Sequence, residues 1–232
     1  MCVDPNVTAT DPRVQALIPH VTARGPIIDW PDVPIDERRR YVMARLVDQY
    51  GYPVNGAAGI VGNLNSESEI LPSRLEGSGA STPMQSLDFS KVAQDWDPPA
   101  VRDRNETTRV GPLKPGVGLA QWTKASRRSG FFAHAYGSRP AGTGILFDMD
   151  AQIDYLVSEL QSGYTGVNTV VSNPAVTLND ASDEVVYNFE TPAAVLTSDL
   201  QNKLPRTDPA VQAVFTYRRG LSQQALNAYN NR

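Results

Sequence analysis

One helix in this chain carries a glycine at every third position, and that pattern limits its possible folds more than any other feature. Residues 55–67 read NGAAGIVGNLNSE, a run with helical spacing in which Gly56, Gly59 and Gly62 recur. Asn55 is a good residue to cap its start. Each glycine costs a helix about 1 kcal/mol relative to alanine. We therefore predict that this helix packs with close backbone contact against another element.

The apolar face of the same helix ends in an acid. Ala57, Ile60, Val61 and Leu64 recur at the spacing of one helical face, and Glu67 falls next on that stripe. Glu67 is either a surface residue at the edge of the stripe or a group desolvated in a cleft. Desolvation raises the pKa of a carboxyl group, and a protonated carboxyl group is the general acid that cleavage of a glycosidic bond requires. Spacing alone leaves both interpretations open.

Helical periodicity extends over much of the remaining chain. Further helices are predicted over residues 36–50, 123–136, 181–190, after Asp148, and from Asp208, where proline follows a capping aspartate. The segment GPLKPGVGLAQWT, residues 111–123, is typical of a turn followed by a short strand in a small β-hairpin region. The predicted fold class is therefore α+β, mostly α.

The chain divides into two predicted parts. Residues 1–34 scatter proline and polar residues without periodicity, so we expect an extended N-terminal arm that docks on a partner or is partly disordered. Residues 35–232 are expected to form one domain, in which residues 72–115 make an unusually long and therefore functional or mobile loop.

Composition and charge exclude several classes of protein. The formal net charge is −4 and the sequence pI is about 5.2, whereas a nucleic-acid-binding protein normally has a basic surplus. Arg38, Arg39 and Arg40 form a basic run that we expect on the solvated face of a helix. No segment approaches the roughly 18 consecutive apolar residues of a membrane-spanning helix. The first residues lack the basic and apolar regions of a secretory signal.

The single cysteine and the two histidines argue against metal and thiol chemistry. Cys2 excludes an intramolecular disulfide and a CxxC zinc site, and it is expected to be an ordinary exposed thiol. His20 and His134 are too few for the usual histidine-rich zinc sites of hydrolases. No metal and no cofactor are expected.

Several motifs occur in one order along the chain, and together they identify a family. They are ESEILP at 67–72 preceded by Gly62-Asn63, GVGLAQWT at 116–123, Arg127-Arg128, DMDAQIDYLVSE at 148–159, VVYNFETP at 185–192, and Arg218-Arg219 leading into Ala225 and Tyr229. This order resembles the phage tail lysozymes and, more distantly, the goose-type lysozymes and lytic transglycosylases. The resemblance covers about residues 36–232 and implies a lysozyme-like domain. It implies that Glu67 is the catalytic acid and that residues 116–122 line the saccharide cleft.

The residues of the second motif fit sugar binding on physical grounds too. Gly116 and Gly118 lack side chains, so a sugar chain can lie against their backbone. Gln121 offers a donor and an acceptor for an acetamido or hydroxyl group. Trp122 would stack on a sugar ring, although core packing is the alternative. Glu190 is expected to steady the cleft by hydrogen bonding or, alternatively, to be a solvated acid at a helix end.

A second catalytic carboxylate is expected in the segment after Glu67. Glycosidases commonly use two acids, about 5 Å apart for retention and about 6.5–9.5 Å apart for inversion. Asp88, Asp95 and Asp97 are the candidates, and the sequence does not choose among them. Glu69, which stands where the family usually has a small residue, is expected to face water. Transglycosylases of similar fold do without a second acid.

The resemblance implies a muramidase that cleaves the glycan strands of bacterial peptidoglycan, with other phage tail proteins docking on residues 1–34. It also implies a location in the phage virion tail, or alternatively in the host cytoplasm and then the cell wall as an endolysin. Two functions stay open beside it, which are a lytic transglycosylase that uses the same Glu67 and a catalytically silent structural tail protein. A wall peptidase or amidase is disfavoured, because no Cys-His or zinc-ligand pattern is present.

Overall fold

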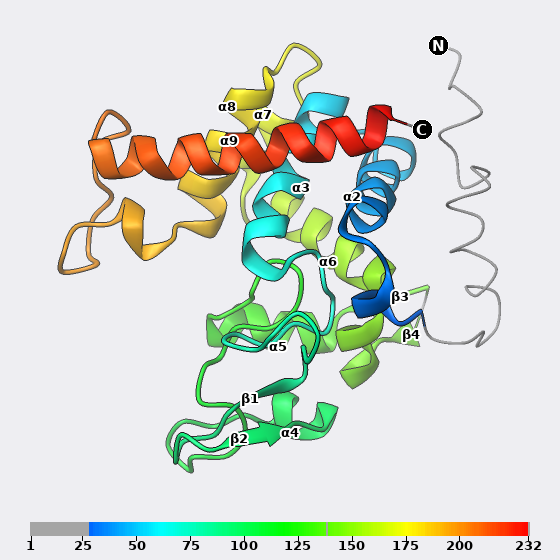
Figure 1. The fold of residues 1–232 in the computed structure, drawn as a ribbon, viewed down its shortest axis with the longest axis vertical. Coiled ribbons are helices and arrows are strands. Elements are labelled where there is room, and N and C mark those ends of the chain that lie inside the picture. Colours follow the sequence, from blue (N-terminus) through cyan, green and yellow to red (C-terminus); the bar gives the residue numbers. More distant parts are fainter. Residues whose placement is uncertain (1–27, 138, 232) are drawn as a thin grey trace. The chain divides into compact units, whose positions relative to one another are not determined.

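The computed structural model describes residues 28–137 and 139–231 of the chain, so most of the expected N-terminal arm, residues 1–27, lies outside the described residues (Figure 1). The helices are α2 (Ile35–Ala44), α3 (Val54–Ser68), α4 (Pro98–Arg102), α5 (Ala125–Ala133), α6 (Met149–Ser162), α7 (Thr165–Val171), α8 (Leu178–Glu184) and α9 (Pro209–Asn230). The strands are β1 (Gln85–Leu87), β2 (Ala93–Asp95), β3 (Ala135–Tyr136) and β4 (Arg139–Pro140). This composition confirms the predicted α+β, mostly α, class.

Short irregular helices connect the longer elements. Three-residue to six-residue 3₁₀ turns cover Trp30–Asp32, Gly142–Phe147 and Ala193–Val195, and π-helical turns cover Arg45–Gln49 and Val185–Glu190. The strands form two separate antiparallel pairs, β1 with β2 and β3 with β4. Within the described residues, no helix is both long and apolar enough to cross a membrane.

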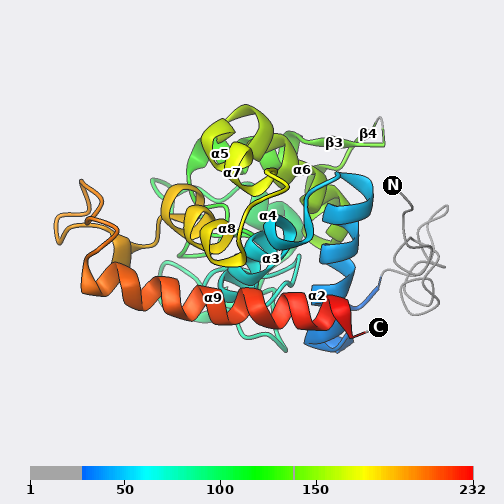
Figure 2. The same ribbon diagram turned by 90° about the horizontal axis from the view of Figure 1, so that it is seen from above.

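The described residues form two compact units. Among the described residues, the first contains 28, 35–66 and 158–231, and the second contains 29–34, 67–137 and 139–157. In the first unit, α9 packs against both α2 and α8, and α2 meets it near its C-terminal end (Figure 2). As predicted, Asp208 caps α9 and Pro209 occupies its first turn, with the Asp208 carboxylate accepting a hydrogen bond of 2.8 Å from the backbone N–H of Ala210.

The glycines of α3 make the close contacts that the sequence predicts. A β-carbon on Gly56 would stand 1.9 Å from the carbonyl oxygen of Val171, and one on Gly62 would stand 2.3 Å from Oγ of Ser222. Gly59 meets α8 in the same way. Three different helices therefore approach α3 at positions where no side chain intervenes, and this closeness compensates for the low helix propensity of glycine.

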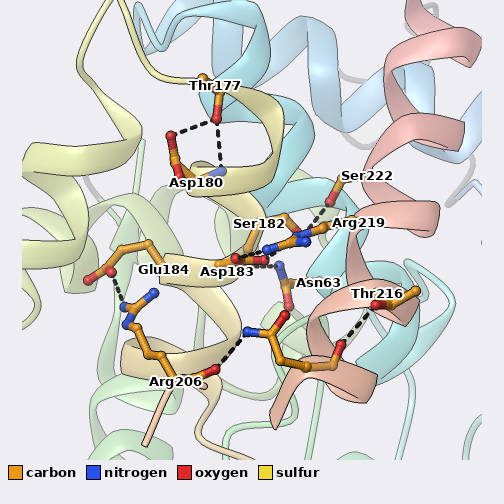
Figure 3. Close-up of polar contacts among 11 residues, drawn as sticks. Asn63, Thr177, Asp180, Ser182, Asp183, Glu184, Arg206, Thr216, Arg219 and Ser222 are labelled. Carbon is orange, nitrogen blue, oxygen red and sulfur yellow. Dashed lines mark hydrogen bonds and ion pairs between the residues drawn. The ribbon is translucent and has the colours of Figure 1, made fainter. Parts of the chain in front are cut away.

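Buried polar groups join α3, α8 and α9 at this junction. The side-chain amide of Asn63 donates to the carbonyl oxygen of Ser182 at 3.1 Å, and Oγ of Ser222 donates to Oγ of Ser182 at 3.0 Å (Figure 3). Arg219 of α9 forms an ion pair with Asp183 of α8, also drawn in Figure 3. Small residues and paired polar groups thus replace large apolar side chains here.

The expectation that the basic run lies on a solvated helix face is wrong. Arg38, Arg39 and Arg40 are each less than 9% exposed. The guanidinium of Arg39 donates to Oε1 of Gln224 at 2.5 Å, and that of Arg40 donates to the carbonyl oxygen of Ala228 at 3.1 Å. The aliphatic parts of these arginines are covered because α9 packs on α2. The guanidinium groups of Arg39 and Arg40 are satisfied jointly by α9 and by Asp36 and Glu37 of α2.

Tyr52 gives the first unit a predicted alkaline transition. Burial raises the pKa of Tyr52 from 10.0 to about 12, and its hydroxyl donates to Oδ1 of Asn168 at 2.6 Å. Because the folded state holds this proton more tightly, its stabilising effect is complete below pH 10 and is lost as the pH rises through about 12. We expect the free energy of unfolding to fall by on the order of 2–3 kcal/mol across that window.

A Tyr52→Phe variant isolates this effect. It should lose about 1 kcal/mol near neutral pH, where the hydrogen bond to Asn168 is missing, and its stability should vary less between pH 10 and 12. Urea unfolding at a series of pH values measures both quantities. Parallel pH profiles for the two proteins would contradict the prediction.

Candidate functional site

Glu67 is the penultimate residue of α3 and lies in the second unit, with residues 68–157. The apolar stripe that leads to it is buried as predicted, since Ile60 and Leu64 are each 1% exposed. Glu67 itself is half-buried, whereas Glu69 is exposed, as expected. The carboxyl group of Glu67 therefore stands at the place where the buried face of the helix meets solvent.

The backbone directly after Glu67 is strained. Glu69 and Ile70 have φ angles of 54° and 56°, in the left-handed region that favours glycine. Ile70 is β-branched and has no exposed surface, so it holds this conformation at a cost of order 1–3 kcal/mol. Gln121, in the second sequence motif, has a φ angle of 44°. Backbone strain of this kind concentrates at functional sites.

Hydrogen bonds tie the chain after Glu67 to the turn formed by residues 116–122. Oγ of Ser68 donates to the carbonyl oxygen of Leu119 at 2.8 Å. The backbone N–H of Gly118 donates to the carbonyl oxygen of Arg74 at 2.8 Å, and the two segments also meet in an isolated bridge between Leu75 and Val117. The first and second sequence motifs therefore form one connected frame, which includes Glu67.

Gln152 of α6 is a residue of this frame whose role sequence analysis missed. Its side chain has no exposed surface, and its Oε1 accepts from the backbone N–H of Leu119 at 2.9 Å. Its amide nitrogen donates to the carbonyl oxygens of Pro72 at 2.8 Å and Ile145 at 2.7 Å. The glutamine stood in the motif DMDAQIDYLVSE, and that was its only signal in the sequence.

The predicted strand over the GVGLAQWT motif is wrong. Val117 makes only the isolated bridge, and residues 118–121 form a turn. Gly118 has a φ angle of 72°, and a β-carbon there would stand 2.6 Å from Oε1 of Gln152. The glycine is thus required by the turn and by the approach of Gln152. The antiparallel pairs of this unit are instead β1–β2, inside the segment expected to be a loop, and β3–β4 after α5.

Gln121 presents one half of its amide group inward. Its Nε2 donates to the carbonyl oxygens of Arg74 at 3.1 Å and Gly118 at 3.0 Å. Its Oε1 accepts no hydrogen bond within the described part of the chain, and the side chain is half-buried. The residue therefore serves the frame with its donor and keeps an acceptor that a ligand N–H group can use.

Trp122 lies in the core of the second unit. Its side chain has no exposed surface, and its ring centroid is 4.8 Å from that of Phe131 and 5.2 Å from that of Tyr155. A ring without exposed surface cannot stack on a sugar. The core-packing alternative therefore describes Trp122, and sugar stacking does not.

The three candidate aspartates have structural partners on the hairpin and on α4. Asp88 accepts hydrogen bonds from the backbone N–H groups of Ser90 and Val92, and the bond from Val92 is the main cause that lowers its pKa. Asp95 accepts from the side chain of Gln85 across β1–β2 at 3.1 Å. Asp97 caps α4. None of these contacts selects one of the three as a second catalytic acid, so their catalytic role stays a prediction.

Two further expected residues are placed as follows. Glu190 is half-buried at the end of the π-helical turn Val185–Glu190, in the first unit, and its expected steadying role stays a prediction. Gly116 is buried, and its backbone N–H donates to the carboxylate of Glu76 at 3.1 Å.

Two arginine side chains form hydrogen bonds with backbone carbonyl groups of the segment that precedes the turn at residues 118–121. Arg128 is 8% exposed, and it donates to the carbonyl oxygens of Val101, at 2.6 Å, and of Pro115. Burial, and secondarily the charge of Arg104, lowers the pKa of Arg128 to about 10, so it stays charged at neutral pH. Arg104 donates to the carbonyl oxygen of Leu113 at 2.7 Å.

His134, the histidine that the structure describes, is paired. Its Nε2 lies 2.8 Å from Oδ2 of Asp154. Across residues 28–137 and 139–231, no group of three or more histidine, cysteine, aspartate or glutamate side chains is arranged to hold a metal ion.

Comparison with known proteins gives one family. A family model described as phage tail lysozyme matches residues 37–215 of the chain. Neither the curated proteins nor the solved structures that were searched contain a match.

Proposed function

Because the chain belongs to the phage tail lysozyme family, we propose that it is a muramidase that cleaves the glycan strands of bacterial peptidoglycan, with Glu67 as the general acid. The observation that supports this role is the position of Glu67. It is a half-buried carboxyl group at the end of an apolar helix face, next to a strained backbone that is tied to the GVGLAQWT turn.

The proposed reaction uses one proton of the enzyme. Glu67 would protonate the bridging oxygen while the bond between that oxygen and the anomeric carbon of muramic acid breaks. In one route, water would attack the anomeric carbon from the side opposite to the departing oxygen and lose its proton to an aspartate among Asp88, Asp95 and Asp97. In the other route, the muramoyl acetamido group would attack from that opposite side. Water would then open the resulting ring from the side of Glu67 and lose its proton to Glu67 in its carboxylate form.

Gln121 is the proposed sugar-contacting group, and Gly118, whose N–H and carbonyl groups are both bonded within the frame, would shape the turn that presents it. The unused Oε1 of Gln121 can accept a hydrogen bond from an acetamido N–H, which both sugars of peptidoglycan carry. Fixing the other half of the amide on Arg74 and Gly118 holds this acceptor in one orientation, so little side-chain entropy is lost when the sugar binds.

The setting of the reaction is also a proposal. A lysozyme of a phage tail would open the cell wall locally for entry of the genome, and residues 1–34 would dock it on other tail proteins. Release as an endolysin is the alternative. The family assignment supports an origin in a phage and does not separate the two settings.

Product analysis tests the hydrolase against a lytic transglycosylase. We expect digestion of purified sacculi to give saccharides with a reducing muramic acid end, one water heavier than the anhydro form. Mass spectrometry separates the two products. Anhydro-muramic ends as the main product would replace the hydrolase proposal with a transglycosylase that uses the same Glu67.

Comparing the clearing of sacculi by the wild-type chain and by Glu67→Gln tests the enzyme itself. Equal clearing by both proteins would dismiss Glu67 as the acid. Absence of clearing by a folded wild-type chain would instead favour a catalytically silent structural tail protein.

A further inference from the structure

Arg74 is a largely buried cation with an unsatisfied donor. Its side chain is 17% exposed, and its Nη1 is buried without a hydrogen-bond partner among the residues that the structure describes. The nearest carboxylate belongs to Glu69, whose Oε1 lies 3.5 Å from Nη2. That separation is longer than the about 2.7–2.9 Å of a charge-assisted hydrogen bond. The free protein therefore leaves this guanidinium only weakly compensated.

Other arginines of the same unit show that this is an exception. Arg128 is more deeply buried, yet it donates to two backbone carbonyl oxygens, and Arg104 does the same. A buried donor without an acceptor is costly in native proteins, most of all on a charged group, and an absent ion is one of its explanations.

The backbone of Arg74 is fixed within the frame that includes Glu67. Its carbonyl oxygen accepts hydrogen bonds from the backbone N–H of Gly118 and from Nε2 of Gln121. The residue stands seven positions after Glu67. A rigid backbone position with an unsatisfied cationic side chain is suited to hold an anion at a defined place beside the saccharide.

We propose that Arg74 binds a carboxylate of the peptide stem of peptidoglycan, and that the chain therefore prefers glycan strands whose stems are charged. The inference rests on the proposed function. A guanidinium group can form a bidentate hydrogen-bonded pair with a carboxylate, whereas the N-acetylated sugar rings are neutral. The incoming carboxylate would replace the loose contact of Glu69 with Nη2, since the half-exposed Glu69 side chain can turn into water. Nη1, which is covered in the free protein, would be uncovered by that movement and would become the second donor.

The test uses sacculi stripped of teichoic acids, in two forms. One form is native, and in the other the stem carboxylates have been converted to amides, which removes their charge and leaves the glycan intact. We expect kcat/KM of the wild-type chain to be about ten- to a hundred-fold lower on amidated sacculi than on native ones. This is the effect of losing one charged hydrogen-bonded pair. The Arg74→Gln variant should have this low kcat/KM on both native and amidated sacculi.

Two results would overturn the proposal. Equal losses of Arg74→Gln, relative to wild type, on native and amidated sacculi would mean that Arg74 only supports the frame. Wild-type activity of Arg74→Gln on native sacculi would mean that no carboxylate binds there. Thermal unfolding of each variant separates loss of the fold from loss of the contact.

Two matched variants sharpen the comparison. Arg102→Gln removes the same charge from an exposed arginine that is paired with Asp103, and it should leave the ratio of native to amidated activity unchanged. Glu69→Gln removes the competing carboxylate, so it should raise kcat/KM on native sacculi a few-fold and have no such effect on amidated ones. A Glu69→Gln variant with equal changes on both forms would contradict the exchange of partners.

A binding measurement separates this inference from the proposed function. Glu67→Gln protein should co-sediment with native sacculi about tenfold more tightly than the Glu67→Gln, Arg74→Gln double variant, and the two should bind amidated sacculi alike. If Glu67→Gln cleaves like wild type, the assignment of the acid fails while the binding comparison still tests Arg74. If the two proteins bind native sacculi equally, the role of Arg74 fails alone.

Discussion

Replacing Glu67 with glutamine should lower the rate at which the chain clears purified sacculi by about 10²–10⁴-fold. Glutamine has nearly the same size and keeps the hydrogen-bonding capacity of the position, but it has no acidic proton for the departing glycosidic oxygen. The side chain is half-buried at a helix end, so the substitution should leave the fold intact. Turbidity loss and release of reducing ends measure the rate, and circular dichroism checks the fold.

The matched control for this variant is Glu106→Gln. It makes the same chemical change at an exposed glutamate of the same unit, outside the frame around Glu67. Its clearing rate should stay within about twofold of wild type, since substitutions of exposed residues away from buried or bonded groups usually change stability very little. If both variants lost activity equally, the effect would reflect net charge on a charged wall and would carry no information about a general acid.

The second large effect is expected at Gln152, where leucine should lower the free energy of unfolding by about 3 kcal/mol or more. Leucine is similar in volume but cannot bond to the backbone groups of Leu119, Pro72 and Ile145. The backbone N–H of Leu119 and the carbonyl oxygen of Pro72 would then lose the hydrogen bonds that Gln152 supplies, at about 1–3 kcal/mol each. The carbonyl oxygen of Ile145 would keep its hydrogen bond from the backbone N–H of Asp148 at 3.2 Å. Because the same bonds hold the turn beside Glu67, clearing of sacculi by the folded variant should also slow.

Gln161→Leu is the control for that variant. Gln161 belongs to the same helix, α6, but is exposed, so leucine there should change the free energy of unfolding by no more than about 0.5 kcal/mol. Urea unfolding compares the two. Equal stability of the two variants would show that the three hydrogen bonds contribute nothing net, and Gln152 would lose its assigned role.

Local patterns predicted the parts of the fold in which one helix face determines burial. The stripe that ends at Leu64, the glycines of α3 and the cap at Asp208 all follow from spacing and residue type, because these effects act within a few residues along the chain. The strand predicted over residues 116–122 was wrong because the local pattern there does not decide the structure. Glycines at 116 and 118 suit a turn as well as a strand, and the hydrogen bonds of the turn come from distant segments.

The burial of the basic run shows a different limit. In the sequence, Arg38, Arg39 and Arg40 cannot be told from a solvated charged face. The α9 acceptors of Arg39 and Arg40, which are Gln224 and the carbonyl oxygen of Ala228, stand more than 180 positions away. Only the packing of α9 on α2 makes these charges internal, since an arginine is buried when both its stem and its donors find partners.

The sequence by itself determined that a helix rich in glycine would pack tightly and end in an acid, because helical spacing and residue size are local properties. Tertiary structure alone decided what surrounds that acid. It places Ser68, Gln121 and Gln152 on one hydrogen-bonded frame, buries Trp122, and leaves Arg74 with an unsatisfied donor. These outcomes depend on contacts between donors and acceptors that are far apart in the sequence, and a local sequence pattern does not determine such contacts.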